Sequence, residues 1–466
     1  MRKIFFYNSI VSIFALAFLL VTTHSSHAQG VIRDAEIETL LMEYSHPIFV
    51  AGGLPPSSVN IFILNDTTLN AFVAGGRNIF LNTGLIFDTD TPEVLIGVIA
   101  HETGHIIGGH LARTQDALAR SSKPVLFSTL LGLGALLAGA ADLGMAVLAG
   151  GQTIGERSFL AYSRTQESAA DQAALRLLKH SKISARGLEK LMEQLSHEEI
   201  LSEEHRSPYT RTHPLSQERL NIFRQQIKRS RYYDKPTDKK LQHRHNMMKA
   251  KLYGFLSPIS EVYREYRIED KSKPARYARA ISQYRIGNID KALEMMTGLI
   301  EEEPKNPWFY ELNGQILYES GQIDRSLPYY ERALELVPDQ ALIMIELATA
   351  MLAMQKQEKI RPAINYLENA LILEKENPRA YQQLAIAYYR LGDQPRADLA
   401  TAERYFLLGD KRTARDIAKR AQKGMKRSSI QWLRAQDIIT SGKDLEEESK
   451  REEQKTKGRR RSPRNR

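Results

Sequence analysis

The chain of 466 residues contains no cysteine. Disulfide bridges and thiolate metal ligands are therefore excluded, and so is membrane attachment through a lipid-modified cysteine. The absence of cysteine is compatible with an oxidising compartment but does not require one. A metal site in this chain would have to be built from histidine and carboxylate side chains.

Long apolar runs are rare, and the first lies at the N-terminus. Residues 10–21 are apolar, follow basic residues at positions 2 and 3, and precede the small residues Ser26 and Ala28. A basic start, an apolar segment and a small-residue cleavage site are typical of a secretory signal peptide. A retained anchor is the alternative, although this run is short for a membrane span. We expect residues 1–28 to be a cleaved signal peptide.

Acidic residues are missing from the C-terminal end. Residues 455–466 hold seven lysines or arginines and no acid, and the formal net charge of +10 depends heavily on them. We expect residues 441–466 to be a disordered basic tail. Peripheral contact with an anionic lipid surface and simple solvation both fit this charge. Nucleic acid would fit it too, but a secreted protein rarely meets nucleic acid, and we predict no such partner.

The main motif that is present reads His101-Glu102-Thr103-Gly104-His105, inside a run over residues 91–110 whose apolar side chains fall at helical spacing. Residues four positions apart are rotated by about 400°, so His101 and His105 lie on one face of a helix, one turn apart. Two imidazoles in this arrangement can share a zinc ion, and Glu102 beside them can hold the attacking water. The alternative is a helix with two unrelated histidines, because a five-residue match is only moderately specific.

A second motif offers a third ligand. Glu167-Ser168-Ala169-Ala170-Asp171 opens another helical run. Glu167 could complete a His, His, Glu site that leaves a fourth position for water, and Asp171 would then accept the free ring N–H of a ligand histidine. A surface helix with an acidic first turn is the alternative. Together the motifs predict one Zn²⁺ per chain, bound by His101, His105 and Glu167.

The two motifs resemble those of the zinc metallopeptidase family that includes HtpX and the CAAX prenyl proteases. Asn70-Ala71-Phe72, with Gly75-Gly76 and Ile79-Phe80, resembles the hairpin that precedes the zinc helix in that family. Thr212-His213-Pro214, followed by Arg219, resembles a further segment of it. With a signal peptide and helical repeats, the chain resembles the periplasmic, BepA-like branch over residues 30 to about 440.

The resemblance implies a mainly α (α+β), zincin-like peptidase domain with a small sheet, and zinc-dependent endopeptidase activity. It implies a periplasmic location at or near the outer membrane, unfolded or misassembled outer-membrane proteins as substrates, and the barrel-assembly machinery as a partner of the repeats. His213 is implied as a fourth zinc ligand or switch that displaces the catalytic water, and Arg219 as a catalytic group that stabilises the oxyanion. The alternatives are a histidine that only shapes a turn or contacts substrate, and a chaperone with latent peptidase activity.

Strand-like patterns precede the zinc helix at residues 61–64, 71–74 and 78–81, with a tight turn permitted by two glycines. Proteases commonly hold a substrate peptide as an extra strand along an open sheet edge. A purely structural hairpin is the alternative. The substrate edge is expected to consist of Phe72, Ala74, Gly75 and Gly76.

A second apolar segment, Pro124–Gly151, separates the two zinc motifs and carries Asp142 as its only charge. One membrane crossing would place His105 and Glu167 on opposite sides of a bilayer, and two crossings would need about forty apolar residues. We therefore expect a helical hairpin, which either lies in the core or dips into lipid.

Three further histidines are candidate metal ligands. His110 is rotated by about 900° from His101 on a continuous helix, so we predict it on the opposite face and exclude it as a ligand. His243 and His245 form an HxH pair in a basic stretch. A second metal site is one interpretation of this pair, and a solvated helix face is the favoured one.

The C-terminal half repeats with a period of 34 residues. Pro307–Gln340 carries the aromatic, glycine, alanine and proline positions of a tetratricopeptide repeat, and residues 341–377 form a longer unit with extra residues near 355–359. Such helix pairs stack into a superhelix that usually binds proteins, although a helical domain without a binding role is the alternative. The predicted domains are a peptidase over residues 29–255, a linker over 256–272 and a repeat domain over 273–440.

Overall fold

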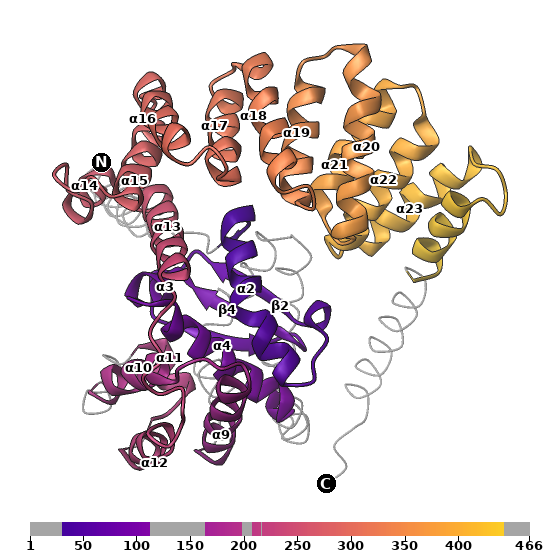
Figure 1. Cartoon of the computed structure of the whole chain (residues 1–466). Coiled ribbons are helices and arrows are strands. Elements are labelled where there is room, and N and C mark those ends of the chain that lie inside the picture. The colour runs from indigo at the N-terminus through magenta and orange to yellow at the C-terminus, as the bar shows by residue number, and fades with distance from the viewer. Residues whose placement is uncertain (1–29, 112–163, 198–206, 216, 442–466) are drawn as a thin grey trace, which may run out of the picture.

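The computed structural model describes residues 30–111, 164–197, 207–215 and 217–441. A mixed domain of helices and strands is formed by the N-terminal part, and an arc of paired helices follows it (Figure 1). The described residues are mainly helical and include a small sheet in the first domain. This arrangement confirms the predicted α+β domain followed by an all-helical repeat array.

The sheet has four strands in the order β1-β2-β4-β3. β2 and β4 are parallel, whereas β1 pairs with β2 and β3 with β4 in antiparallel fashion. The turn between β3 and β4 contains Gly75 and Gly76, both with positive φ, so the predicted hairpin is present. The strands are β1 (Val31–Ile32), β2 (Asn60–Leu64), β3 (Ala71–Ala74) and β4 (Asn78–Asn82).

Helix α4 (Pro92–Ile107) lies at the centre of the N-terminal domain and is buried over most of its length. Its N-cap residue is Thr91, whose side chain makes no capping hydrogen bond. The helices around it are α2 (Ala35–Ala51), η1 (Pro56–Ser58), α3 (Thr83–Asp88), α9 (Arg164–His180), α10 (Arg186–Ser196), α11 (Pro208–Thr212) and α12 (Gln217–Ile227).

Two glycines allow neighbouring helices to approach α4 closely. A Cβ atom on Gly104 would lie 2.8 Å from the carbonyl oxygen of Ala170 on α9. A Cβ atom on Gly97 would lie 2.7 Å from the Cβ of Leu188 on α10. Because α9 packs directly against the turn that carries the two histidines, its own first turn lies beside them.

The repeat array consists of helix pairs that match the predicted units. The three extra residues of the longer unit extend α20, which has 17 residues where α18 has 14. The helices are α15 (Lys273–Arg285), α16 (Ile289–Glu302), α17 (Pro307–Glu319), α18 (Ile323–Leu336), α19 (Ala341–Ala353), α20 (Gln357–Leu373), α21 (Pro378–Arg390), α22 (Gln394–Leu407) and α23 (Lys411–Lys423).

The junction between the two halves is packed rather than open. Helix α13 (Lys239–Leu256) places Met248 and Leu252 in the core of the N-terminal domain and Met247 in a core formed by the first repeats. The stretch predicted as a linker, residues 256–272, contains α14 (Ile259–Glu265), whose Val262 is fully buried. The two predicted domains are therefore joined by two packed helices, α13 and α14, rather than by an extended linker.

The predicted solvated face at His243 and His245 is wrong for His245. Its ring is buried, with Nδ1 3.1 Å from the hydroxyl of Tyr44 and Nε2 3.1 Å from the hydroxyl of Thr89. Burial lowers the pKa of His245 to about 4, so this side chain is a neutral core residue. His243 lies 3.6 Å from Glu303 on the other side of α13, because residues two apart point in different directions on a helix.

Several predicted segments lie outside the described residues: the signal peptide, the apolar segment 124–151 and most of the basic tail. Across the parts of the chain that are described, none of the helices combines the length and the apolar character that a membrane crossing needs.

Candidate metal centre

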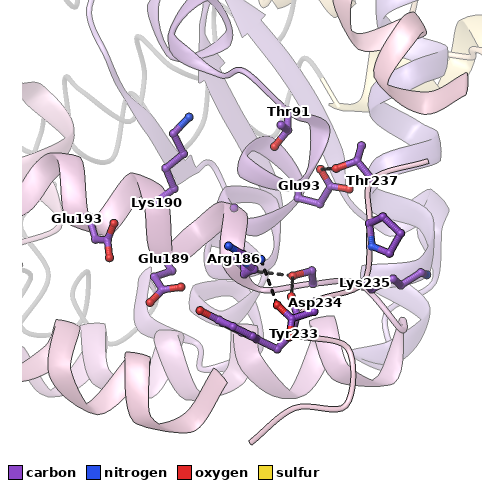
Figure 2. Close-up of a pocket in the computed structure, with 13 residues that line it drawn as sticks. Thr91, Glu93, Arg186, Glu189, Lys190, Glu193, Tyr233, Asp234, Lys235 and Thr237 are labelled. Atoms are coloured by element: carbon purple, nitrogen blue, oxygen red, sulfur yellow. Dashed lines mark hydrogen bonds and ion pairs between the residues drawn. The ribbon is translucent and has the colours of Figure 1, made fainter. Parts of the chain in front are cut away.

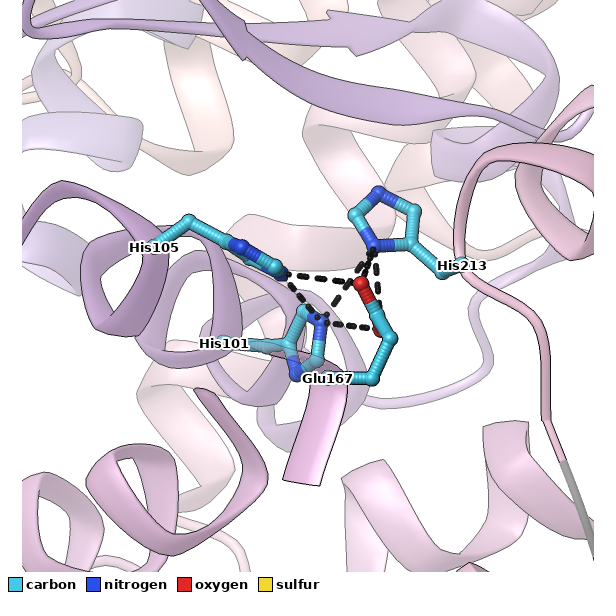
Figure 3. Close-up of side chains that lie close together, drawn as sticks. All are labelled: His101, His105, Glu167 and His213. Carbon is cyan, nitrogen blue, oxygen red and sulfur yellow. Dashed lines mark hydrogen bonds and ion pairs between the residues drawn. The ribbon is translucent and has the colours of Figure 1, made fainter. Parts of the chain in front are cut away.

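Four buried side chains from three separate helical segments meet at one point (Figure 3). His101 and His105 come from α4, Glu167 comes from the first turn of α9, and His213 directly follows α11. One nitrogen or oxygen atom from each of them lies within 4.8 Å of the others. The structure thus brings the three predicted ligands together, with the predicted fourth beside them.

The distances between these atoms fit a tetrahedral metal site. His101 Nε2 lies 3.1 Å from His105 Nε2 and 3.4 Å from Glu167 Oε2. His213 Nδ1 lies 3.4 Å from His101 Nε2 and 3.2 Å from Glu167 Oε1. Ligand atoms about 2.0–2.1 Å from a central ion would be about 3.3–3.4 Å apart at tetrahedral angles. The side chains present therefore fit a small divalent cation.

The electrostatics of the cluster also favour a cation. Burial acts to lower the pKa of His101, but hydrogen bonds to Asp171 and Glu167 outweigh it and raise that pKa to about 10. Burial acts to raise the pKa of Glu167, yet His213 and His101 hold it well below its usual range. Because the buried carboxylates stabilise positive charge at this point, a divalent metal ion would be well accommodated there.

Asp171 and Arg219 contact the ligand side chains without being among the four ligand residues. Asp171 Oδ1 lies 3.1 Å from His101 Nδ1, which is the position predicted for it. Arg219 donates two hydrogen bonds to Asp171, at 2.8 and 3.0 Å, and its Nη2 lies 3.2 Å from Glu167 Oε2. The expected oxyanion role places Arg219 at the substrate, whereas this geometry makes it a residue that orients two carboxylates.

Glu102 lies on α4 between the two histidines and is fully buried. Neither of its carboxylate oxygens has a hydrogen bond within the described residues, although Oε1 lies 3.5 Å from His213 Nε2. Burial raises the pKa of Glu102. A carboxylate with a raised pKa and available lone pairs is suited to accept a proton from water near neutral pH.

His213 connects the cluster to the sheet. Its Nδ1 faces the ligand atoms, and its Nε2 lies 3.3 Å from the carbonyl oxygen of Ala71 on β3. Within the described residues, β3 pairs only with β4, so it is the edge strand of the sheet. The edge predicted from sequence therefore exists, and it lies directly beside the metal ligands.

The register of this edge differs from the expectation. Asn82 N–H donates to the carbonyl of Asn70 at 3.0 Å, which makes these residues a hydrogen-bonded pair. Because such pairs alternate along antiparallel strands, the backbones of Phe72 and Ala74 face β4, and those of Ala71 and Val73 face outward. The predicted Phe72 and Ala74 are thus displaced by one residue from the groups that a peptide strand could bind.

Comparison with known proteins agrees with this site. Residues 33–227 match peptidase family M48, and residues 277–341 and 312–356 match the tetratricopeptide repeat. The beta-barrel assembly-enhancing protease of Escherichia coli (strain K12) is 26% identical over 400 residues, covering 84% of this chain and 80% of that protein. The protein of the same name from Yersinia pestis is 22% identical over 382 residues, covering 80% and 77%.

Among solved structures, the crystal structure of MamA covers 37% of this chain and 96% of its own, with 18% identity and a TM-score of 0.28. The match to peptidase family M48 spans every ligand of the cluster, from His101 to His213. The N-terminal half of the chain is a metallopeptidase domain.

One histidine of this metallopeptidase domain was misplaced by the sequence prediction. His110 was expected on the opposite face of a continuous helix, but α4 ends at Ile107 and Gly109 has a φ of +60°. The chain reverses there, and His110 Nδ1 lies 2.9 Å from His105 Nδ1. The Gly108-Gly109 pair was the signal that could have shown the reversal.

The metallopeptidase domain also has a cavity of about 650 Å³ away from the metal ligands, shown in Figure 2. It lies between α10, the start of α4 and residues 233–237. Two of its charged side chains, Arg186 and Asp234, form an ion pair at 3.2 Å. This cavity contains none of the four ligands, so volume alone does not identify the reaction centre.

Proposed function

We propose that this chain is a zinc-dependent endopeptidase of the periplasm that acts on outer-membrane proteins during their assembly. The observation that carries the proposal is the tetrahedral spacing of His101, His105 and Glu167, with Glu102 buried beside them. Two imidazole nitrogens and one carboxylate are ligands that suit zinc, whereas Mg²⁺ and Ca²⁺ prefer sites made of oxygen alone.

The residues of the cluster have separable tasks in peptide hydrolysis. When bound here, a zinc ion supplies Lewis-acid chemistry that acidifies water and polarises a carbonyl group. Glu102 accepts the proton of the attacking water and then delivers it to the leaving amine. Asp171 holds the ring of His101 in place, and Arg219 holds both Asp171 and Glu167. Such outer partners fix ligand orientation before the substrate arrives.

The edge strand supports an extended peptide as substrate. Ala71 and Val73 present backbone groups outward from β3, and His213 links the Ala71 carbonyl to Glu102 through contacts of 3.3 and 3.5 Å. A peptide added to this edge would therefore run past the general base. Strands of outer-membrane barrels that have not yet closed expose unpaired backbone, which makes them suitable for this mode of binding. The similar proteins are called beta-barrel assembly-enhancing proteases, and that name favours the same substrate class.

His213 supports a closed resting form of the enzyme. With its Nδ1 among the ligand atoms, His213 would fill the fourth tetrahedral position of a bound ion and exclude water from it. We propose that His213 must leave this position before hydrolysis. His213→Ala should then raise basal proteolysis, including self-cleavage. A folded, zinc-loaded His213→Ala protein with lower activity than wild type would instead assign the residue to substrate contact.

The experiment that tests the proposed function compares wild type with Glu102→Gln. Both proteins should contain one zinc per chain, since Glu102 is not a ligand. Hydrolysis of an unfolded outer-membrane protein should fall by about 10²–10⁴-fold in Glu102→Gln, because only the general base is lost. Glu167→Ala is the matched control and should lose the metal. Equal hydrolysis by wild type and Glu102→Gln would refute the assignment.

A chaperone role is the second candidate, and the position of His213 beside the other ligands favours it, because a site closed by His213 would have little basal activity. In this role the repeats hold assembly partners such as the barrel-assembly machinery, and hydrolysis is secondary. Expression of Glu102→Gln in cells that lack the wild-type protein separates the two functions. Full rescue of outer-membrane protein assembly would favour the chaperone role, and no rescue would favour the peptidase.

A further inference from the structure

His110 lies in contact with a metal ligand but is not among the four ligand residues. It is buried, and its Nδ1 is 2.9 Å from His105 Nδ1. The two rings are nearly perpendicular, at 77°, with centroids 5.0 Å apart. This geometry is that of a hydrogen bond between two imidazoles rather than of stacked rings.

The turn that follows α4 is shaped around this ring. The nearest atom to a Cβ placed on Gly108 would be His110 Nε2, at 2.4 Å, so any side chain at Gly108 would displace the imidazole. Gly109 then adopts a φ of +60°, which reverses the chain and returns His110 towards α4. Gly108 and Gly109 together thus allow the His110 ring to take this position.

The direction of the hydrogen bond follows from the ligand atom of His105. Its Nε2 faces His101 Nε2 at 3.1 Å and Glu167 Oε1 at 3.4 Å, so Nε2 must offer its lone pair to a metal ion. A neutral imidazole with a lone pair on Nε2 carries its proton on Nδ1. The Nδ1–H of His105 therefore donates, and Nδ1 of His110 accepts.

We infer that His110 is a positioning residue that holds His105 in the metal-binding tautomer and orientation, and thereby slows release of the metal. His101 has the corresponding support from the carboxylate of Asp171 at 3.1 Å. The two histidine ligands are thus held by different outer partners, one anionic and one an imidazole. Loss of such a partner typically weakens metal affinity by about 10–100-fold.

The inference rests on the proposed zinc site, and its test measures zinc directly. The mature protein is loaded with Zn²⁺, and the rate of transfer to a chelating dye is recorded. His110→Phe fills the space without an acceptor and should release zinc about 10–100-fold faster. His110→Asn places a carbonyl oxygen near the position of Nδ1 and should remain within a few-fold of wild type. Ile107→Ala, at an exposed neighbouring position, should not differ from wild type.

Gly108→Ala provides an independent test in which His110 is retained. Gly108 has an ordinary helical φ of −66°, so alanine brings no backbone strain, but its Cβ pushes the His110 ring aside. It should also accelerate zinc release. Wild-type release rates in both His110→Phe and Gly108→Ala, or equal acceleration in His110→Asn and His110→Phe, would overturn the inference. Failure of the wild type to bind zinc would refute the proposed function instead.

Discussion

Lys251 joins the two halves of the chain through a buried cluster of ion pairs. Its Nζ is buried and lies 2.8 Å from Asp34 Oδ2, 3.3 Å from Glu36 Oε2 and 3.2 Å from Glu311 Oε2. Asp34 and Glu36 stand at the start of α2 in the metallopeptidase domain, whereas Glu311 lies on α17 of the repeats. One ammonium group thus binds carboxylates from both halves.

Lys251→Met should destabilise this junction strongly. Methionine keeps most of the apolar stem but leaves three carboxylates facing one another without a cation. Removing one partner of a buried ion pair costs about 3–5 kcal/mol. For a domain of 150–250 residues this loss corresponds to a Tm lower by roughly 6–20 °C. Burial already raises the pKa of Glu36 and Glu311, so their protonation should relieve part of the cost at acidic pH.

The assay is thermal unfolding followed by tryptophan fluorescence, because Trp308 and Trp432, the only tryptophans of the chain, both lie in the C-terminal half. Lys356→Met is the matched control, since Lys356 pairs with Asp324 at 3.2 Å on the surface and should cost less than about 1 kcal/mol. Zinc content should be unchanged in both variants. A Tm shift in Lys251→Met no larger than that in Lys356→Met would refute the reasoning.

Two further predictions concern stability. Gln355 has a φ of +57° where the neighbouring repeat has Gly321 with +80°. Gln355→Gly should therefore stabilise the repeat array by about 0.5–1 kcal/mol in denaturant unfolding. Gly321→Gln is the converse control and should destabilise the array, and unchanged stability in both variants would contradict the backbone argument. Burial raises the pKa of Glu311 to about 7, although Lys251 opposes the shift. A raised pKa in the folded state means that stability present below the unfolded value of about 4.5 is lost as pH rises through the folded value. Glu311→Gln should therefore lose less stability than wild type between pH 5 and 8, as measured by denaturant midpoints, and parallel curves would exclude Glu311 as the source.

Local periodicity predicted most of the fold and of the site. The spacing of His101 and His105 fixes their common face on any helix, and the 34-residue period fixes the helix pairs of the repeats. Glu167 could be named because the second motif also begins a helix. The spacing of the histidines and the repeat period each follow from the geometry of one element, whereas the position of Glu167 beside the histidines depends on α9 packing against α4.

The errors arose where a local rule was extended too far. The angle calculated for His110 assumed an unbroken helix, and Gly109 breaks it. The substrate edge was displaced by one residue because strand periodicity gives two faces but does not say which backbone groups bond to a neighbour. His245 was assigned to solvent from its basic neighbours, although one face of α13 packs against α2 and α3.

The boundary predicted near residue 255 shows what sequence periodicity omits. It falls at the end of α13, after Met247 and Lys251, both of which contact the repeats. A peptidase fragment ending there would expose Met247 and leave Lys251 without Glu311. Separation of the N-terminal half at this point therefore carries a specific energetic cost, because the Lys251 contact that would be lost lies in a buried site.

The two contacts of His213 connect metal access to substrate access. Its Nδ1 lies among the candidate ligand atoms, and its Nε2 lies 3.3 Å from the outward carbonyl of Ala71. The preceding segment binds the same edge, since Tyr209 N–H donates to the carbonyl of Leu69 at 3.2 Å. A peptide strand that pairs with Ala71 must compete for that carbonyl, and displacement of the ring also vacates the metal position. We therefore propose that substrate binding and opening of the metal site are coupled through His213, so that a closed site need not be an inactive one.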